Sequence, residues 1–464
     1  MARPQSPSAT PLVDVPIFPF PHDDTVLNSL ADATEYELPP RRQADDLVHT
    51  YWSVMHPLFP VPDRSRFMQS YNALFLGKTA DIDERILLST LNAMFAFAVQ
   101  LHESTDRNGR ERLSGKYFRR AQALLQLTVW EKGSIDLVQC LLLISQYLQC
   151  TNQPHQTWMT VGSAVRIAQS LGLHLTEVWS TPGDEGAALK RRVWQSCVIM
   201  DRTICIAHGR PAMIPDNTAS TIRSLSHLSS EGDRNDHLTY DDFVAASLEL
   251  CEIIHCAVRR YFSPPRTQNC SVGHAQLLEP STTEENMAHI LRFDGCLRRW
   301  ENSLPGSLKY GGSSSLRDAS TTRQAAVLHL RLLHSRILLF RPLLARYCSE
   351  TDPDSHPNGI LTEHMLERCA SECVRAAQNT ISIVTQYSML DICTILPAWW
   401  FRVFYMYTAA MVLAVSTLRL DLFPRSTTEV AWQNAQMFFQ ENEHLSEAVK
   451  VCKSALQRMV TRIE

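Results

Sequence analysis

The sequence predicts an all-α protein, organised as one large multi-helix domain with a superhelical or orthogonal arrangement. Glycine is scarce, at 16 of 464 residues, which is about half the usual share and disfavours turn-rich β architecture. Apolar residues make up 45% of the chain and recur at spacings of three and four, the period of a helix. No segment shows a convincing strand alternation, and no fixed-period repeat indicates a regular solenoid.

Composition divides the chain into an N-terminal arm and a helical domain. Residues 1–43 are rich in Pro, Ser, Asp and Thr without a helical period, which predicts a disordered arm. Residues 44–464 are predicted to form the domain. Polar or proline-containing stretches within it predict loops at about 215–237, 263–285, 306–320 and 351–360.

Helical periodicity predicts an ordered series of elements along the domain. Ser134 precedes one of them and is expected to act as its N-cap. Pro342 is expected to kink or end its helix, because proline lacks the N–H that an α-helix needs. Segment 51–67 predicts a short helix followed by an extended turn. Its aromatic residues are expected to begin the core, with His56 at the surface or at a cap. Further helices are expected at 82–101, 115–127, 135–148, 158–172, 190–208, 240–262, 285–304, 321–342, 369–383, 397–413 and 428–462.

The most informative segment runs from residue 190 to 211, KRRVWQSCVIMDRTICIAHGRP. Its apolar residues occupy two adjoining helical faces, which predicts that the helix is mostly buried. Asp201 and Arg202 then enter an interior where an unpaired charge is costly, so both are expected to have partners. Gly209 can adopt the left-handed conformation that ends a helix, and Pro211 prevents the helix from resuming.

Cysteine usage and hydropathy indicate a reducing compartment. The chain has 13 cysteines, and its first residues, MARPQSPSATP, lack the apolar core of a secretory signal. The most apolar stretch, 399–415, is interrupted by Arg402, so we expect a buried helix there and no membrane span. The net charge of -4 provides no strong field to attract phosphates.

Several motifs, in order along the chain, resemble one family. Segment 190–211 carries Arg-Arg-x-Trp, ending in Arg192 and Trp194, then Asp201-Arg202, then Gly209-Arg210-Pro211. This pattern resembles the signature of the fungal-specific transcription factor domain, the middle region that normally follows a zinc binuclear cluster in fungal regulators. Similar motifs occur at 51–67, 158–174, 369–383, 397–413 and 328–342, the last ending in Arg341-Pro342. The resemblance implies a nuclear or nucleocytoplasmic regulator of transcription, with a metabolic gene cluster as one expected target.

The zinc cluster of that family has no counterpart in this sequence. Such a cluster needs six thiolates from closely spaced pairs, whereas no cysteine precedes Cys140 and no Cys-x-x-Cys occurs. We therefore expect no zinc, no other cofactor and no direct sequence-specific DNA binding. The chain would act through transcription regulators or other proteins, as a co-regulator or competitor, or the gene model has lost an upstream exon. A small-molecule effector and a homodimer are left open.

Catalytic chemistry is the weaker interpretation, and we do not expect an enzyme. The sequence contains no His-Glu-x-x-His, no Gly-x-Ser-x-Gly and no phosphate loop. Asp201 with Arg202 could form a catalytic pair, but a buried structural anchor is favoured. Arg210 and Arg341 each precede a proline at an expected helix end, where a guanidinium can satisfy terminal carbonyls.

A cluster of aromatic residues leaves a second class of function open. Trp399, Trp400, Phe401, Phe404 and Tyr405 are close enough in sequence to line an interhelical cavity for a small molecule. Core packing is the default interpretation of such residues. A ligand-binding or catalytic protein that reuses the helical scaffold is thus the alternative, and a scaffold for protein assembly is a third interpretation.

Overall fold

A computed structural model describes residues 38–463 except for 126–132, 180–185, 217–239, 263–282, 312–317, 350–358 and 390–395. Every regular element in these residues is helical, with fifteen α-helices, one short 3-10 helix and no strand among them, which confirms the all-α prediction. The helices in chain order are α1 (Arg41–Val54), α2 (Arg64–Phe75), α3 (Glu84–Leu101), α4 (Arg107–Leu125), α5 (Ile135–Cys150), α6 (Pro154–Ser170), α7 (Thr176–Trp179), α8 (Ala187–His208), α10 (Tyr240–Phe262), α11 (Thr283–Ser303), η4 (Gly306–Leu308), α12 (Ala319–Ser349), α13 (Gly359–Met389), α14 (Trp399–Ser416), α15 (Arg425–Glu441) and α16 (Glu447–Ile463).

Helix ends follow local chemistry that the sequence already carried. The Ser134 hydroxyl accepts the Leu137 N–H at 3.1 Å at the start of α5, which confirms the predicted N-cap. After α6, Gly172 adopts a φ of +72°, and the Leu173 N–H donates to the Ala168 carbonyl at 3.0 Å. This hydrogen bond closes a Schellman motif. The positive φ that the motif needs at Gly172 would be strained in a residue with a Cβ.

Several predicted helix boundaries are wrong; α4 begins at Arg107 and not at 115, and α13 spans Gly359–Met389 and not 369–383. The helix expected at 428–462 is two helices, α15 and α16, because Asn442 ends α15 and its carbonyl accepts the Leu445 N–H at 3.0 Å in a tight turn. Of the two outcomes expected at Pro342, the helix end is wrong, because α12 continues to Ser349 with buried leucines such as Leu339 and Leu343 on both sides of the proline. Helix α1 begins at Arg41, so residues 41–43 of the predicted arm are helical.

The predicted loops and the arm fall mostly on residues outside the described ranges. Residues 1–37 of the arm are among these, as are most of 215–237, 263–285 and 351–360. In the stretch 306–320, the described residues contain η4 and the first residues of α12. The division into an arm and a single domain therefore stays a prediction.

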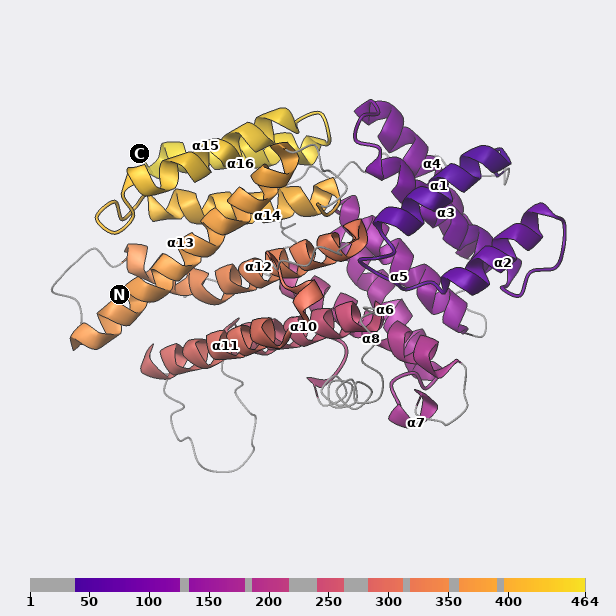
Figure 1. Ribbon diagram of the computed structural model, residues 1–464, viewed down its shortest axis with the longest axis horizontal. Helices are drawn as coiled ribbons and strands as arrows, with labels where there is room; N and C mark the ends of the chain where they lie inside the picture. Colours follow the sequence, from indigo (N-terminus) through magenta and orange to yellow (C-terminus); the bar gives the residue numbers. More distant parts are fainter. Residues whose placement is uncertain are drawn as a thin grey trace, which may run out of the picture.

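The first helices, α1 to α6, gather at one end of the molecule, and the last four, α13 to α16, gather at the other (Figure 1). The long helix α12 lies between them and packs against α10, α13 and α14. Its N-terminal side chains close the end of α1: Arg323 Nη1 donates to the carbonyls of Ser53 at 3.0 Å and Val54 at 3.1 Å. A cation at these otherwise unpaired carbonyls is favourable because the C-terminus of a helix is its negative end.

A second set of contacts joins α14 and the α15–α16 turn to α3 and α4. Trp399 Nε1 donates to the Gln100 carbonyl at 3.1 Å, and Arg402 forms an ion pair with Glu103. Arg110, fully buried on α4, donates to the Leu445 carbonyl and lies over the Trp399 ring, 5.8 Å from its centroid. The two ends of the molecule are thus joined by polar contacts from buried arginines as well as by apolar packing.

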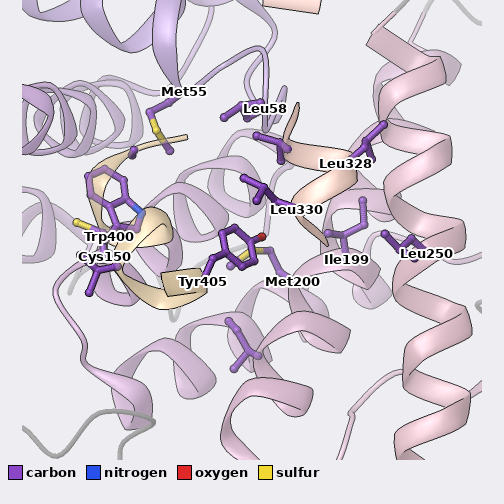
Figure 2. Close-up of a cluster of buried hydrophobic side chains, with 14 of the residues drawn as sticks. Met55, Leu58, Cys150, Ile199, Met200, Leu250, Leu328, Leu330, Trp400 and Tyr405 are labelled. Carbon is purple, nitrogen blue, oxygen red and sulfur yellow. The ribbon is translucent and has the colours of Figure 1, made fainter. Parts of the chain in front are cut away.

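Apolar side chains from nearly every helix form one continuous core. Figure 2 shows part of it, with residues from the α1 end, α5, α8, α10, α12 and α14 in one cluster. Helix α5 is buried almost throughout, which explains its lack of a polar face. None of the helices in the described ranges meets the length and apolarity that crossing a membrane requires.

His56 contradicts the expectation that it lies at the surface or at a cap. It is buried after α1, with its ring 4.5 Å from the Trp52 ring and its Nε2 3.2 Å from the Pro62 carbonyl oxygen. Burial lowers the pKa of His56 to about 4; Arg192 and Arg64 act in the same direction, while the Pro62 carbonyl and Asp63 oppose it. A neutral ring is therefore part of the folded core.

The buried His56 predicts a loss of stability in acid. Because the pKa of His56 is lower in the folded state than in the unfolded state, the contribution of the neutral ring to the free energy of unfolding is complete above the unfolded pKa. That contribution is lost as the pH falls from about 6.5 to about 4. We expect His56→Gln to flatten this part of the stability curve, by about 1.4 kcal/mol for each pKa unit removed. Urea unfolding at a series of pH values measures the effect, with His49→Gln on the exposed side of α1 as the control. Parallel curves for wild type and His56→Gln would contradict the assignment.

The Ser134 cap predicts a separate effect at the start of α5. Ser134→Ala removes the acceptor for the Leu137 N–H and should lower the free energy of unfolding by about 1 kcal/mol in urea titrations. Ser134→Asp retains an acceptor and should lie near wild type. Equal losses in the two variants would show that the hydroxyl itself is not capping the helix.

Candidate functional site

Helix α8 carries the charged pair that the sequence singles out, and its middle part, from Val193 to Arg202, is buried in the core. Trp194 is fully buried, with the His174 ring 5.9 Å from its own. The helix ends at Gly209 with φ +64°, as predicted, and the Arg210 N–H donates to the Cys205 carbonyl at 3.1 Å. This reversal sends the chain after Pro211 back along α8, past Asp201 and Arg202.

Asp201 holds that returning segment. Its carboxylate accepts the Met213 N–H at 3.0 Å and the Ile214 N–H at 3.1 Å. Two backbone donors on one buried carboxylate satisfy groups that would otherwise be orphaned, and they stabilise the negative charge. The side chain is 3% exposed, so these bonds form away from water.

Arg202 completes the same arrangement with the opposite charge. Its side chain is 0% exposed and donates to Asp201 at 3.1 Å, to the Ile214 carbonyl at 2.8 Å and to Glu252 on α10 at 2.8 Å. The guanidinium therefore joins α8, the segment after Pro211 and α10. The prediction that both charges have partners is confirmed, and the partners show what the pair does: it fixes a backbone turn against two helices.

Two further titratable groups extend this charge cluster toward the surface. Asp216, 42% exposed at its side chain, lies 3.7 Å from Arg202 and 3.4 Å from His255 Nε2, and it also pairs with Arg259. Burial lowers the pKa of His255, with Arg202 acting in the same direction and Asp216 opposing it. Burial likewise raises the pKa of Glu252, against the stabilising effect of Arg202. The cluster has one open side, at Asp216.

Cys205 closes the inner end of the turn. Its thiol donates to the Pro211 carbonyl at 3.2 Å and lies 3.7 Å from an Asp201 oxygen. Burial, reinforced by the Asp201 charge, raises the pKa of Cys205 to about 12. A thiol that resists ionisation is a poor nucleophile and a poor metal ligand, so its role here is a packing and hydrogen-bonding one.

The remaining residues of the segment act as separate contacts around the turn. The Arg210 guanidinium lies over the Trp158 ring of α6, 4.8 Å from its centroid. Arg192, near the start of α8, lies 3.7 Å from Asp63, the N-cap residue of α2. Arg210 and Arg192 thus link α8 to two other helices.

The described ranges contain no grouping of three or more His, Cys, Asp or Glu side chains that could hold a metal ion. The Asp201 cluster fits this finding, because its carboxylates are already occupied by backbone N–H groups and arginines.

Comparison with known proteins identifies the family. Residues 48–268 match the family described as "Fungal specific transcription factor domain". The chain is 33% identical to the "Sorbicillinoid biosynthetic cluster transcription factor 2" of Penicillium rubens over 473 residues, which covers 99% of this chain and 66% of that protein. Residues 48–268 therefore form a fungal-specific transcription factor domain. The chain is also 33% identical to the "Sorbicillinoid biosynthetic cluster transcription factor sor3" of Hypocrea jecorina, and 26% identical to the "Acetamidase regulatory protein" of Emericella nidulans.

These relatives are longer proteins. The chain covers 66% of the Penicillium relative, 64% of the Hypocrea relative and 51% of the Emericella relative, while 95% or more of the chain is matched in each. The segment 190–211 lies inside the matched family domain, residues 48–268. The second motif, Arg341-Pro342, lies outside it.

Arg341-Pro342 differs from its predicted place. The pair lies inside α12 and not at a helix end, so Arg341 does not cap terminal carbonyls there. Pro342 is half-buried and Arg341 is exposed. The apolar residues on both sides hold the helix across the proline, which sequence rules treat as a breaker because they weigh only the local backbone.

The five aromatic residues proposed to line a cavity lie on α14 and contact other protein groups. Trp399 and Trp400 pack edge to face at 5.6 Å, and Trp400 lies 6.1 Å from the Phe97 ring of α3. Figure 2 shows Trp400 and Tyr405 among the buried side chains of the core. Phe404 lies 4.9 Å from the ring of His334, and Phe401 is half-buried 5.9 Å from Trp400. These contacts favour the packing interpretation, while a ligand at α14 stays a prediction.

Sequence reasoning missed the partners that complete the Asp201–Arg202 cluster. Glu252 is 50 residues from Arg202 in sequence, and Asp216 and His255 carry no motif of their own. One signal was available: Glu252, His255 and Arg259 recur at spacings of three and four on a predicted helix, which places titratable groups on one of its faces. The buried arginines Arg110 and Arg323 were missed as well, because their carbonyl partners are invisible in sequence.

The Asp201 cluster predicts a large and local stability effect. Asp201→Asn removes one of the two carboxylates that bond the buried Arg202 and replaces the charged acceptor of the Met213 and Ile214 N–H groups with a neutral amide, so the loss should be on the order of 3–5 kcal/mol. Asp81→Asn is the matched control, because Asp81 is 73% exposed and pairs with Arg66 at the surface, where about 0–1 kcal/mol is expected. Chemical denaturation measures both. Similar losses in the two variants would argue against Asp201 as the anchor of the turn.

Proposed function

We propose that this chain is the regulatory part of a fungal transcription regulator that controls genes of a metabolic pathway. The observation that carries this proposal is the 33% identity over 99% of the chain to a protein named as a biosynthetic cluster transcription factor. The acetamidase regulatory protein, matched over 95% of the chain, adds a second metabolic regulator to the relatives. A nuclear or nucleocytoplasmic location follows from this role.

We further propose that residues 1–464 act on transcription through other proteins and do not read DNA sequence themselves. The net charge of -4 gives no overall attraction for phosphates, and the chain has no cysteine before Cys140 that could serve a zinc cluster. The buried charges of Asp201 and Arg202 are paired with groups inside the protein. No cofactor and no catalytic step belong to this role.

A small-molecule effector and self-association remain part of the proposal as modes of regulation. The aromatic residues of α14 lie at the junction between the two ends of the molecule, where a bound ligand could change the Trp399–Gln100 and Arg402–Glu103 contacts. A homodimer would add a second regulatory contact. The catalytic alternative has no specific observation in its favour.

A tethering experiment tests the proposed role. Residues 1–464 are fused to a heterologous DNA-binding module and expressed in a fungal host that carries a reporter with the module's binding site. We expect a severalfold change in reporter transcript relative to the module alone, and no change when the chain is expressed without the module. A reporter that responds equally to the fusion and to the bare module would contradict a regulatory role. A reporter that responds to the unfused chain would contradict the dependence on partners.

A further inference from the structure

Helix α4 is strongly basic in a chain whose net charge is negative. Its sequence, RNGRERLSGKYFRRAQALL, contains five arginines, one lysine and a single acidic residue, while the whole chain carries -4. A surface helix normally mixes both signs. The concentration of positive charge on α4 therefore calls for a partner of opposite sign.

Half of these cations already have internal roles. Arg107 pairs with Glu111 at 3.0 Å and with Glu447 at 2.8 Å, and Arg110 and Arg120 are buried. The other three, Arg112, Lys116 and Arg119, are exposed or half-buried and follow one another at spacings of four and three. They therefore form one row along the outer face of α4, here called the basic row.

The basic row has no acidic partner within the described part of the chain. None of the ion pairs found there includes Arg112, Lys116 or Arg119. Leu113, beside the row, is 37% exposed. The surface thus offers three cations and an apolar side chain, which is the complement of a segment that carries both acidic and apolar residues.

The chain itself contains such a segment before α1. Between residues 14 and 37 there are six acidic residues and no lysine or arginine: Asp14, Asp23, Asp24, Asp32, Glu35 and Glu37. Apolar residues alternate with them, including Ile17, Phe18, Phe20, Leu27 and Leu30. The segment ends four residues before α1, which packs against α3, the helix that α4 covers most extensively.

We propose that the acidic segment 14–37 binds the basic row of α4 in the same chain. Covalent attachment close to α1 gives the segment an effective concentration on the order of 1 mM, so a weak electrostatic contact is sufficient. The contact would cover an exposed face of α4 and would strengthen as ionic strength falls. It does not depend on the proposed function, because both surfaces belong to this chain.

A nucleic acid is the competing occupant and fits the surface less well. Phosphates would satisfy Arg112, Lys116 and Arg119, but the net charge of -4 works against a polyanion. A phosphate backbone also has no counterpart for Leu113, whereas the acidic segment supplies apolar side chains.

Zero-length carbodiimide cross-linking of the full chain, read by mass spectrometry, tests the contact directly. Lys116 supplies the amine, and the carboxylates of residues 14–37 supply the acid. Lys78, exposed just after α2, provides the baseline for simple tethering, since Arg41 at the start of α1 bonds Asn72 of α2 at 2.6 Å. We expect the yield at Lys116 to exceed that at Lys78 by at least fivefold. Equal yields at the two lysines would overturn the proposal.

A charge-reversal pair supplies the control. Arg112→Glu with Arg119→Glu keeps Lys116 and should reduce its cross-links at least fivefold. Arg458→Glu with Arg462→Glu reverses two exposed cations of α16 and should leave the yield of Lys116 cross-links unchanged. If the first variant fails to fold, raising the salt from 0.05 M to 0.5 M with wild type must reduce the Lys116 yield relative to Lys78. Cross-links that persist in the variant or in salt would overturn the proposal.

Two further outcomes separate the alternatives. A mixture of isotopically light and heavy chains distinguishes contacts within a chain from contacts between chains, and predominantly mixed cross-links would overturn the intramolecular assignment. Binding of a random-sequence DNA duplex that the Arg112→Glu/Arg119→Glu variant loses, without any Lys116 cross-link to residues 14–37, would assign the basic row to nucleic acid instead.

Discussion

The buried pair of Asp201 and Arg202 is the interaction on which the surrounding structure depends. Desolvating two full charges is costly, and hydrogen bonds and ion pairs to buried partners offset that cost. Here the partners are backbone groups of Met213 and Ile214 and the Glu252 carboxylate. Because these groups come from the turn after α8 and from α10, the pair can be satisfied in one arrangement of three segments. Its contribution is therefore to specificity of arrangement as much as to stability.

The same chemistry recurs wherever distant helices meet. Arg323 closes α1, Arg110 reaches the α15–α16 turn, and Arg402 pairs with Glu103. The chain uses 37 arginines and 7 lysines, and these contacts show a physical use for that bias. A guanidinium presents several N–H donors in a rigid plane and can bind two or three acceptors at once when buried. An ammonium group, more strongly hydrated, would be a poorer choice at these junctions.

The polar contacts of the interior are distinct from the charged groups that are open to solvent. The core of this protein is continuous, and its polar junctions are internal. Groups open to solvent, such as Asp216 and the basic row of α4, lie at the margins of these junctions.

The all-α class, most helices, the Ser134 cap and the Gly209 stop were determined by the sequence alone. They depend on periodicity and on backbone chemistry within a few residues, both of which can be read locally. The need for partners at Asp201 and Arg202 was equally readable, because a charge within an apolar helix must be neutralised. The family motifs also pointed to the correct family before any geometry was known.

Only the tertiary structure decided which groups those partners are. Glu252 and Asp216 meet Arg202 because α10 and the turn after Pro211 pack against α8, and packing of distant segments leaves no local pattern. The same reason explains the errors. Buried neighbours hold α12 across Pro342, and the core surrounds His56, although each residue considered with its sequence neighbours indicated a break or a surface position. Local rules describe the isolated backbone, whereas long-range burial supplies the free energy that overrides them.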